Sequence, residues 1–215
     1  MKKIIFKFFD LLSLPLAYIW NEKVAFLYNT LMCRMYARII GCRLKGAKNL
    51  CVYASPVMIR GAKKISVGDN VEIGVYARID AITSYQKTGQ RFNPDFRIGN
   101  NVVINANCHI GCINKVEIGE YTTIGARTYI TDHTHGTVEF EDLKLPPRHR
   151  KLYSKGPVII GKYVTIGEGC AIMPGVIIGD HAVIGANAVV TKNIPPYSVA
   201  AGNPAKVLKQ VLVDK

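Results

Sequence analysis

Acidic residues are scarce in this 215-residue chain, which has 15 Asp and Glu against 28 Lys and Arg and a formal net charge of +13. The excess is uneven, because the first fifty residues contain nine basic and two acidic side chains. Such a charge indicates an anionic partner. The chain has no zinc-finger spacing, RNP-like aromatic motif or helix-turn-helix pattern, so nucleic acid is disfavoured as that partner. Lipid headgroups or the phosphates of a cofactor fit better.

The N-terminal region also lacks a long hydrophobic run. Its longest uncharged stretch, residues 11–21, is eleven residues, about half of what a membrane-spanning helix needs. Lys7, Asp10 and Pro15 interrupt the apolar pattern and no clear cleavage site follows, which argues against a secretory signal. We therefore expect a cytoplasmic protein, with the inner face of the membrane as its place of work.

Cysteines are few and scattered. Only Cys108 and Cys112 lie close together, and this C-x3-C spacing has no second pair that would complete a zinc site. We expect reduced thiols and no bound metal.

What the sequence does contain is a six-residue repeat: an aliphatic residue recurs at every sixth position over long stretches, and glycine often follows it. This period fits neither an α-helix nor indefinite strand alternation. It fits a coil in which each hexapeptide forms one short strand and one corner, with about eighteen residues per triangular turn and about 4.8 Å between turns. Gly, Asn and Asp would serve the corners. The aliphatic positions are Val67, Ile73, Ile79, Ile98, Ile104, Ile110, Ile118, Ile124, Ile130, Ile160, Ile166, Ile172, Ile178, Ile184 and Val190.

These hexads make residues 44–208 resemble the hexapeptide acyltransferase superfamily. The resemblance implies a left-handed winding, which the period alone does not give. We therefore expect an all-β fold, a left-handed parallel β-helix with three short parallel sheets. A helical segment at 1–43 would precede it, loops at 81–96 and 137–157 would interrupt it, and a tail at 209–215 would follow.

The N-terminal segment has two interpretations. Apolar residues recur with helical spacing over 4–12 and again over 24–40, with a break at Pro15. One interpretation is a cap that covers the exposed edge of the β-helix. The other is a helix on the membrane surface, with basic side chains toward lipid phosphates. These are Lys2, Lys3, Lys7, Arg34 and Arg38.

Two histidines are candidates for a general base, which acetyl transfer from a thioester to a hydroxyl requires. His133 and His135 lie where the hexad period stops after Ile130 and a loop begins. The chain resembles the galactoside, maltose and polysaccharide O-acetyltransferases, in which the catalytic histidine follows the last aliphatic residue of a hexad by five positions. That resemblance implies His135, with His133 as the alternative.

Two further residues are assigned to the acceptor site. Asp132 would fix the imidazole tautomer or stabilise the imidazolium, unless it is simply a corner residue. Asn105 follows an inward aliphatic residue, at the place where the same branch has a substrate-binding asparagine, and its alternative is also a corner role. His109, His149 and His181 are expected to be ordinary surface residues.

The run from Ile184 to Val207 is similar to the terminal coil of acetyl-CoA-using members of the superfamily. This similarity implies acetyl-CoA as co-substrate, with backbone amides at Glu168 and Ala186 binding the pantetheine arm. Thr191 and Lys192 would lie beside it, and Lys206 and Lys209 would face the nucleotide phosphates. The alternative is a segment that merely caps the coil.

The resemblance thus predicts an acetyl-CoA-dependent O-acetyltransferase, acting on a carbohydrate acceptor that is lipid-linked or part of a surface polysaccharide or lipopolysaccharide. It also implies a homotrimer with active sites between subunits. The alternatives are a xenobiotic or serine acetyltransferase, a non-catalytic scaffold, and a γ-class carbonic-anhydrase-like zinc protein using His109, His133 and His135. The two-residue spacing of the last two histidines disfavours the zinc protein.

Overall fold

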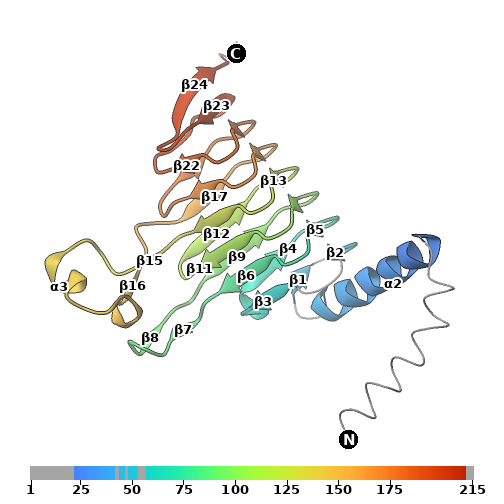
Figure 1. Cartoon of the computed structure of the whole chain (residues 1–215), viewed down its shortest axis with the longest axis horizontal. Coiled ribbons are helices and arrows are strands. Elements are labelled where there is room, and N and C mark those ends of the chain that lie inside the picture. The colour runs from blue at the N-terminus through green and yellow to red at the C-terminus, as the bar shows by residue number, and fades with distance from the viewer. Residues whose placement is uncertain (1–21, 42–43, 47, 53–56, 212–215) are drawn as a thin grey trace, which may run out of the picture.

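The computed structural model describes residues 22–41, 44–46, 48–52 and 57–211. Its main body is a tapering stack of triangular coils with three sheets, and all strand pairs between coils are parallel (Figure 1). Sheet A contains β1 (Lys45–Gly46), β4 (Ile65–Val67), β9 (Asp95–Ile98), β12 (Lys115–Ile118), β17 (Val158–Ile160) and β20 (Ile177–Ile178). Sheet C contains β3 (Met58–Arg60), β6 (Arg78–Ala81), β11 (His109–Cys112), β14 (Tyr129–Thr131), β19 (Ala171–Ile172) and β22 (Val189–Val190).

Sheet B closes the triangle and ends in β24 (Lys206–Gln210), an antiparallel strand that returns along β23 (Ser198–Ala201). Its strands are β2 (Cys51–Val52), β5 (Glu72–Ile73), β10 (Val103–Ile104), β13 (Thr123–Ile124), β18 (Thr165–Ile166), β21 (Val183–Ile184), β23 (Ser198–Ala201) and β24 (Lys206–Gln210). The fold is the parallel β-helix that the hexads predicted, with the left-handed winding that the family resemblance implied.

The core is a column of aliphatic side chains inside the triangle. All the repeated positions are buried, and equivalent residues pair from coil to coil, as in Ile79 with Ile110 and Ile110 with Ile130. Buried Thr122 and Thr128 lie among them, and each donates its hydroxyl to a carbonyl of the next coil. Stacking identical positions lets every coil bury its apolar face against the next.

The corners use more than Gly, Asn and Asp. Aromatic residues also adopt the left-handed backbone conformation, and four of them, at φ between 55° and 59°, form a stack. Their rings stack along the axis with centroid separations of 5.0, 4.9 and 4.6 Å. The stacked residues are Tyr121, Tyr163, His181 and Tyr197. Ring stacking therefore accompanies a backbone conformation that is unfavourable for tyrosine.

The two predicted insertions form one projecting arm (Figure 1). The first is the hairpin of β7 (Ser84–Tyr85) and β8 (Gln90–Arg91). The second starts from the pair β15 (Thr134–His135) and β16 (Leu152–Tyr153) and carries α3 (Phe140–Leu143) and the short 3-10 helix Pro147–His149. The side chain of Gln90 bonds both the N–H and the carbonyl of Leu152, at 2.7 and 2.9 Å. The two loops therefore support each other beside the histidines.

At the N-terminal end, α2 (Glu22–Gly41) packs against β2, and its Ala37 joins the hydrophobic core. A short 3-10 helix, Ala62–Lys64, precedes β4. The predicted helical run at 4–12 lies outside the described residues. No helix in the described part of the chain is long and apolar enough to cross a membrane. The helix thus contacts the first coil of the β-helix through β2, and its role as a cap stays a prediction.

Candidate active site

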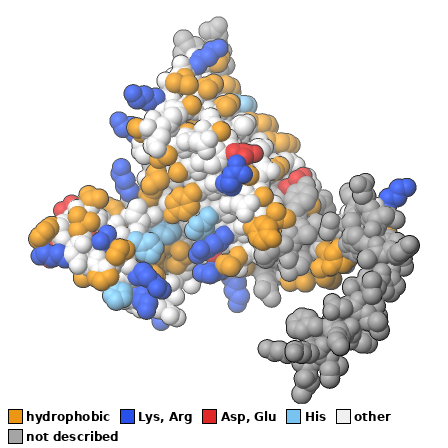
Figure 2. Space-filling model, viewed as in Figure 1, with side chains coloured by type: hydrophobic (Ala, Val, Ile, Leu, Met, Phe, Trp, Pro, Cys, Tyr) orange, Lys and Arg blue, Asp and Glu red, His pale blue; other side chains and the backbone are white. Residues whose placement is uncertain are grey.

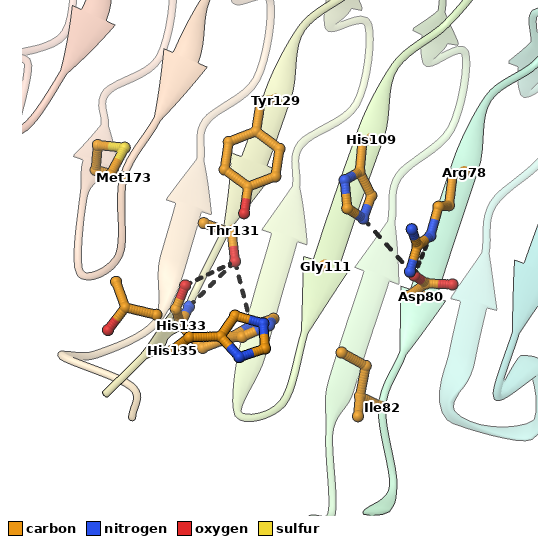
Figure 3. A pocket seen from close by; sticks show the side chains of 11 residues that line it. Arg78, Asp80, Ile82, His109, Gly111, Tyr129, Thr131, His133, His135 and Met173 are labelled. Carbon is orange, nitrogen blue, oxygen red and sulfur yellow. Dashed lines mark hydrogen bonds and ion pairs between the residues drawn. The ribbon is translucent and has the colours of Figure 1, made fainter. Parts of the chain in front are cut away.

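A pocket of about 410 Å³ lies on the outer face of sheet C, where the arm leaves the coil (Figure 3). In the space-filling view, histidine side chains gather at this place with basic side chains beside them (Figure 2). The pocket is lined by Arg78, Asp80, Ile82, His109, Gly111, Tyr129, Thr131, His133, Thr134, His135 and Met173. Both histidines that the sequence selected therefore line one pocket.

His133 is held in a single orientation by a buried carboxylate. Its side chain lies mostly inside the protein, and its Nδ1 lies 2.9 Å from Oδ1 of Asp132, which is fully buried. That carboxylate also accepts the backbone N–H groups of Ile113 and Asn114 at 2.7–3.1 Å. Four short contacts thus fix Asp132, and Asp132 in turn fixes the imidazole.

The hydrogen bonds also determine the tautomer of His133. The hydroxyl of Thr131 donates to the carbonyl of His133 at 3.1 Å, so a lone pair of the same oxygen faces Nδ1, also at 3.1 Å. Both neighbours of Nδ1 are therefore acceptors, and Nδ1 carries the proton. In the neutral ring Nε2 then has a free lone pair, which is the arrangement of a general base.

His135 lies on β15, at the root of the arm, and is more exposed than His133. Its ring meets that of Tyr85 edge-on, with centroids 5.6 Å apart. Desolvation, and secondly the nearby His133, lower the pKa of His135. No carboxylate among the described residues forms an ion pair with it.

A second polar cluster in the pocket was not predicted. The Asp80 side chain is buried and lies 2.5 Å from Nε of Arg78 and 3.6 Å from Nε2 of His109. Burial alone would raise the pKa of Asp80, but His109 and the two arginines, Arg78 and Arg60, hold it below the usual value. His109 was expected to be a surface residue, and instead it lines the pocket against Tyr129. The sequence did not place it there, because the first loop interrupts the period between Arg78 and His109, which pair in adjacent coils.

Asn105 does not line this pocket. It follows β10 at a corner, where its Nδ2 donates to the carbonyl of Ile124 in the next coil at 2.9 Å. In the isolated chain this is the corner role that was its alternative. Its substrate-binding assignment stays a prediction.

The residues assigned to acetyl-CoA lie in the C-terminal coils. A Cβ on Gly125 would meet the backbone nitrogen of Glu168, and a Cβ on Gly167 would meet that of Ala186 in the same way. Glu168 and Ala186 therefore occupy equivalent corners of successive coils. Neither amide N–H donates a backbone hydrogen bond within the described part of the chain. The Glu168 carboxylate lies 2.6 Å from Arg127. The side chains of Thr191, Lys192, Lys206 and Lys209 are all exposed.

Within residues 22–41, 44–46, 48–52 and 57–211, no three His, Cys, Asp or Glu side chains are grouped closely enough to share a metal ion. Cys108 and Cys112 are buried free thiols.

Comparison with known proteins places these features in context. The family model described as bacterial transferase hexapeptide (six repeats) matches residues 157–192. A protein of Escherichia coli K12, named as the lipopolysaccharide biosynthesis O-acetyl transferase WbbJ, is 38% identical over 167 residues, which cover 76% of this chain and 80% of that protein. An acetyltransferase of Staphylococcus aureus COL, SACOL2570, is 37% identical over 115 residues, covering 54% of this chain and 55% of the relative.

Among solved structures, the N-acyltransferase AntD of Bacillus cereus, in complex with dTDP and 3-hydroxybutyryl-CoA, superposes with a TM-score of 0.64. At 20% identity, covering 80% of this chain and 86% of AntD, it shows the shared fold alone. A galactoside acetyltransferase in complex with coenzyme A is 27% identical, with a TM-score of 0.50, and the match covers 80% of this chain and 68% of that protein.

Proposed function

The chain belongs to the hexapeptide-repeat acyltransferase family, and we propose that it transfers an acetyl group from acetyl-CoA to a sugar hydroxyl in lipopolysaccharide or surface-polysaccharide biosynthesis. Family membership makes the protein an acyltransferase. The choice of acceptor is supported by the similarity to the lipopolysaccharide O-acetyl transferase of E. coli. The observation that carries the proposal is the Asp132–His133 pair at the pocket.

In this proposal His133, rather than His135, is the general base. Nε2 accepts the proton of the sugar hydroxyl as its oxygen attacks the thioester carbonyl carbon. The carbon–sulfur bond then breaks, and the imidazolium returns the proton to the departing thiolate. Asp132 stabilises the imidazolium between these steps, because its carboxylate is buried and only 2.9 Å from Nδ1. His135 would serve acceptor binding at the mouth of the pocket.

The register of sheet C supports a path for acetyl-CoA. Thr131, Met173 and Thr191 follow one another on the same face, because Ile130 pairs with Ile172 and Ile172 with Val190. Coils are about 4.8 Å apart. The pantetheine arm would run along this column, with its thioester at Met173 beside His133. The free amides of Glu168 and Ala186 and the exposed Lys206 and Lys209 suit its polar and phosphate groups.

Two further features belong to the same proposal. The pocket lies on the outside of the coil, where a neighbouring subunit of a homotrimer would close it. The helix α2 exposes a stripe made of Leu27, Tyr28, Leu31, Met35 and Ile39, with Arg34 and Arg38 also exposed. An apolar stripe with basic neighbours suits the surface of an anionic membrane, where lipid-linked sugars are assembled.

The test compares three histidine variants of the full chain. Thiol release from acetyl-CoA is followed with a panel of methyl hexopyranosides, and the product is identified by its acetyl mass. His133→Gln should lower kcat by about 10² to 10⁴, the usual contribution of a positioned base. His135→Asn should mainly raise KM for the sugar. His149→Asn, in the exposed loop, is the matched control. Full activity of the His133→Gln variant would refute the assignment of His133 as the base. If the wild type forms no acetylated sugar, the proposed acceptor class is refuted.

A further inference from the structure

The pocket contains a cationic side chain that the transfer mechanism does not use. Arg78 lines the pocket beside His109, with which it pairs on the adjacent coil. Arg60 lies one coil earlier, where it pairs with Asp80. Among the described residues that line the pocket, Asp80 alone is acidic, so two arginines share one carboxylate. This end of the pocket therefore carries more positive than negative charge.

Asp80 holds the guanidinium of Arg78 in one orientation and leaves its terminal nitrogens unused. The Asp80 side chain is about 1% exposed, and its Oδ2 accepts a hydrogen bond from Nε of Arg78 at 2.5 Å. The same oxygen lies 3.6 Å from Nε2 of His109 (Figure 3). Neither Nη1 nor Nη2 of Arg78 bonds a described residue, and the side chain is 43% exposed. The paired terminal nitrogens are thus fixed by a buried group and open to a ligand.

The register sets the distance from these nitrogens to the base. Arg78 pairs with His109, and Gly111 follows His109 by two residues on the same strand. The ring of His133 lies over Gly111, where a Cβ would be 3.1 Å from its Cε1. One coil spacing of about 4.8 Å and two strand residues of about 6.7 Å put the Cα atoms of Arg78 and Gly111 about 8 Å apart. One sugar ring with a charged substituent spans such a distance.

We propose that the acceptor sugar carries an anionic substituent, a phosphate ester or a carboxylate, which the terminal nitrogens of Arg78 bind while a hydroxyl of the same sugar faces His133. This inference rests on the proposed function and specifies its substrate class. Two nitrogens of one guanidinium match two oxygens of either anion. Arg60 adds a second positive charge nearby. Asp80 is a positioning residue, which acts on the acceptor through Arg78.

The test compares charged and neutral forms of one sugar. The best hexose of the panel is supplied as its methyl glycoside, as its 1-phosphate and as the methyl glycoside of its uronic acid. The readout is the ratio of kcat/KM for each anion to kcat/KM for the neutral glycoside. In the wild type this ratio should be about tenfold or more for at least one anion, as expected for hydrogen bonds between charged groups. The phosphate and the uronate distinguish the two sources of negative charge.

Substitutions of Arg78 should change this ratio. Arg78→Gln should bring it close to one, and Arg78→Lys should restore only part of it, because an ammonium group lacks the paired donors. If Arg78→Gln does not fold, Arg78→Lys keeps a cation beside Asp80 and provides the same comparison. An unchanged KM for acetyl-CoA verifies an intact protein. Arg97→Gln is the matched control and should keep the wild-type ratio, since Arg97 pairs with Asp95 at 2.9 Å on sheet A, outside the pocket.

The outcomes separate this inference from the proposed function. Equal use of neutral and anionic sugars by the wild type would overturn the inference, and so would a preference that Arg78→Gln leaves intact. In both cases acetylation of the sugars would still support the proposed function. If the wild type acetylates neither the neutral nor the anionic sugars, the proposed function fails and this inference fails with it.

Discussion

Replacing Asp132 with asparagine should remove the base without removing the histidine. In the native protein Oδ2 accepts the N–H of Asn114 at 2.7 Å, and the N–H of Ile113 is shared between the two oxygens, at 2.9 Å from Oδ1 and 3.1 Å from Oδ2. Oδ1 also faces Nδ1 of His133 at 2.9 Å. An amide has one acceptor oxygen, and two backbone N–H groups require it. The new NH2 group must then face the imidazole. It donates to Nδ1, and the ring proton moves to Nε2.

The size of the effect follows from that tautomer. A ring with its proton on Nε2 has no lone pair toward the acceptor hydroxyl, so the whole contribution of the base is lost. We expect kcat of Asp132→Asn to fall by about 10² to 10⁴, which corresponds to about 3 to 5 kcal/mol in the activation barrier. The KM for acetyl-CoA should stay unchanged, because Asp132 lies beneath the imidazole and away from the C-terminal coils.

The assay is thiol release at saturating acetyl-CoA and sugar. Asp180→Asn is the control, since Asp180 is also a carboxylate that accepts a backbone N–H, that of Lys162 at 2.8 Å, but at another corner. The double variant Asp132→Asn with His133→Gln should be no slower than His133→Gln alone, because the two residues act as a unit. A kcat for Asp132→Asn within about threefold of the wild type would refute the tautomer argument.

Four further outcomes are expected. In free energy, Gly111→Ala should raise the activation barrier of sugar acetylation more than it lowers the stability of the fold, since its Cβ would press on the His133 ring. Equal free-energy losses from the kinetics and from a melting curve would contradict this. The lowered pKa of His135 means that the unfolded chain binds its proton first, so stability falls as pH drops below about 6.5. His135→Asn should therefore reduce that fall, measured by urea unfolding at pH 7.5 and 5.5. Tyr163→Asn should destabilise the protein by about 1 to 3 kcal/mol through the loss of two ring contacts, with unchanged kcat. Replacing Leu31 and Met35 with glutamate should abolish sedimentation of the protein with anionic vesicles. Equal sedimentation of the wild type and this variant would refute membrane binding through α2.

Much of the fold was predictable because a solenoid repeats one local rule. Each hexad needs an inward aliphatic residue, so the period marks the core directly, and residues such as Ile110 and Ile130 are buried as expected. Breaks in the period likewise marked the two loops. The tyrosines of the corner stack were not anticipated, because their left-handed conformation is supported by ring contacts between coils, which no single hexad contains.

The site was predictable in part. The end of the period after Ile130 identified the segment with both histidines. The family resemblance implied His135, but spacing along the chain cannot reveal which ring a carboxylate holds. That depends on the direction of the chain at Asp132 and on two backbone N–H groups from the coil before it. The comparisons do not decide between the two histidines, and the geometry is the reason to propose His133.

The sequence by itself determined the coil, its core and the place where the chain leaves it, because these depend on spacing between near neighbours. Only the tertiary structure decided which distant residues share the pocket. Asp80 and Gly111 are 31 positions apart, since the first loop lies between them, yet they pair directly in adjacent coils. Because of the loop, the pairing of these two residues cannot be read from their spacing in the sequence. The parallel pairing of strands in sheet C sets it, and Asp80, Gly111 and His133 line one pocket as a result.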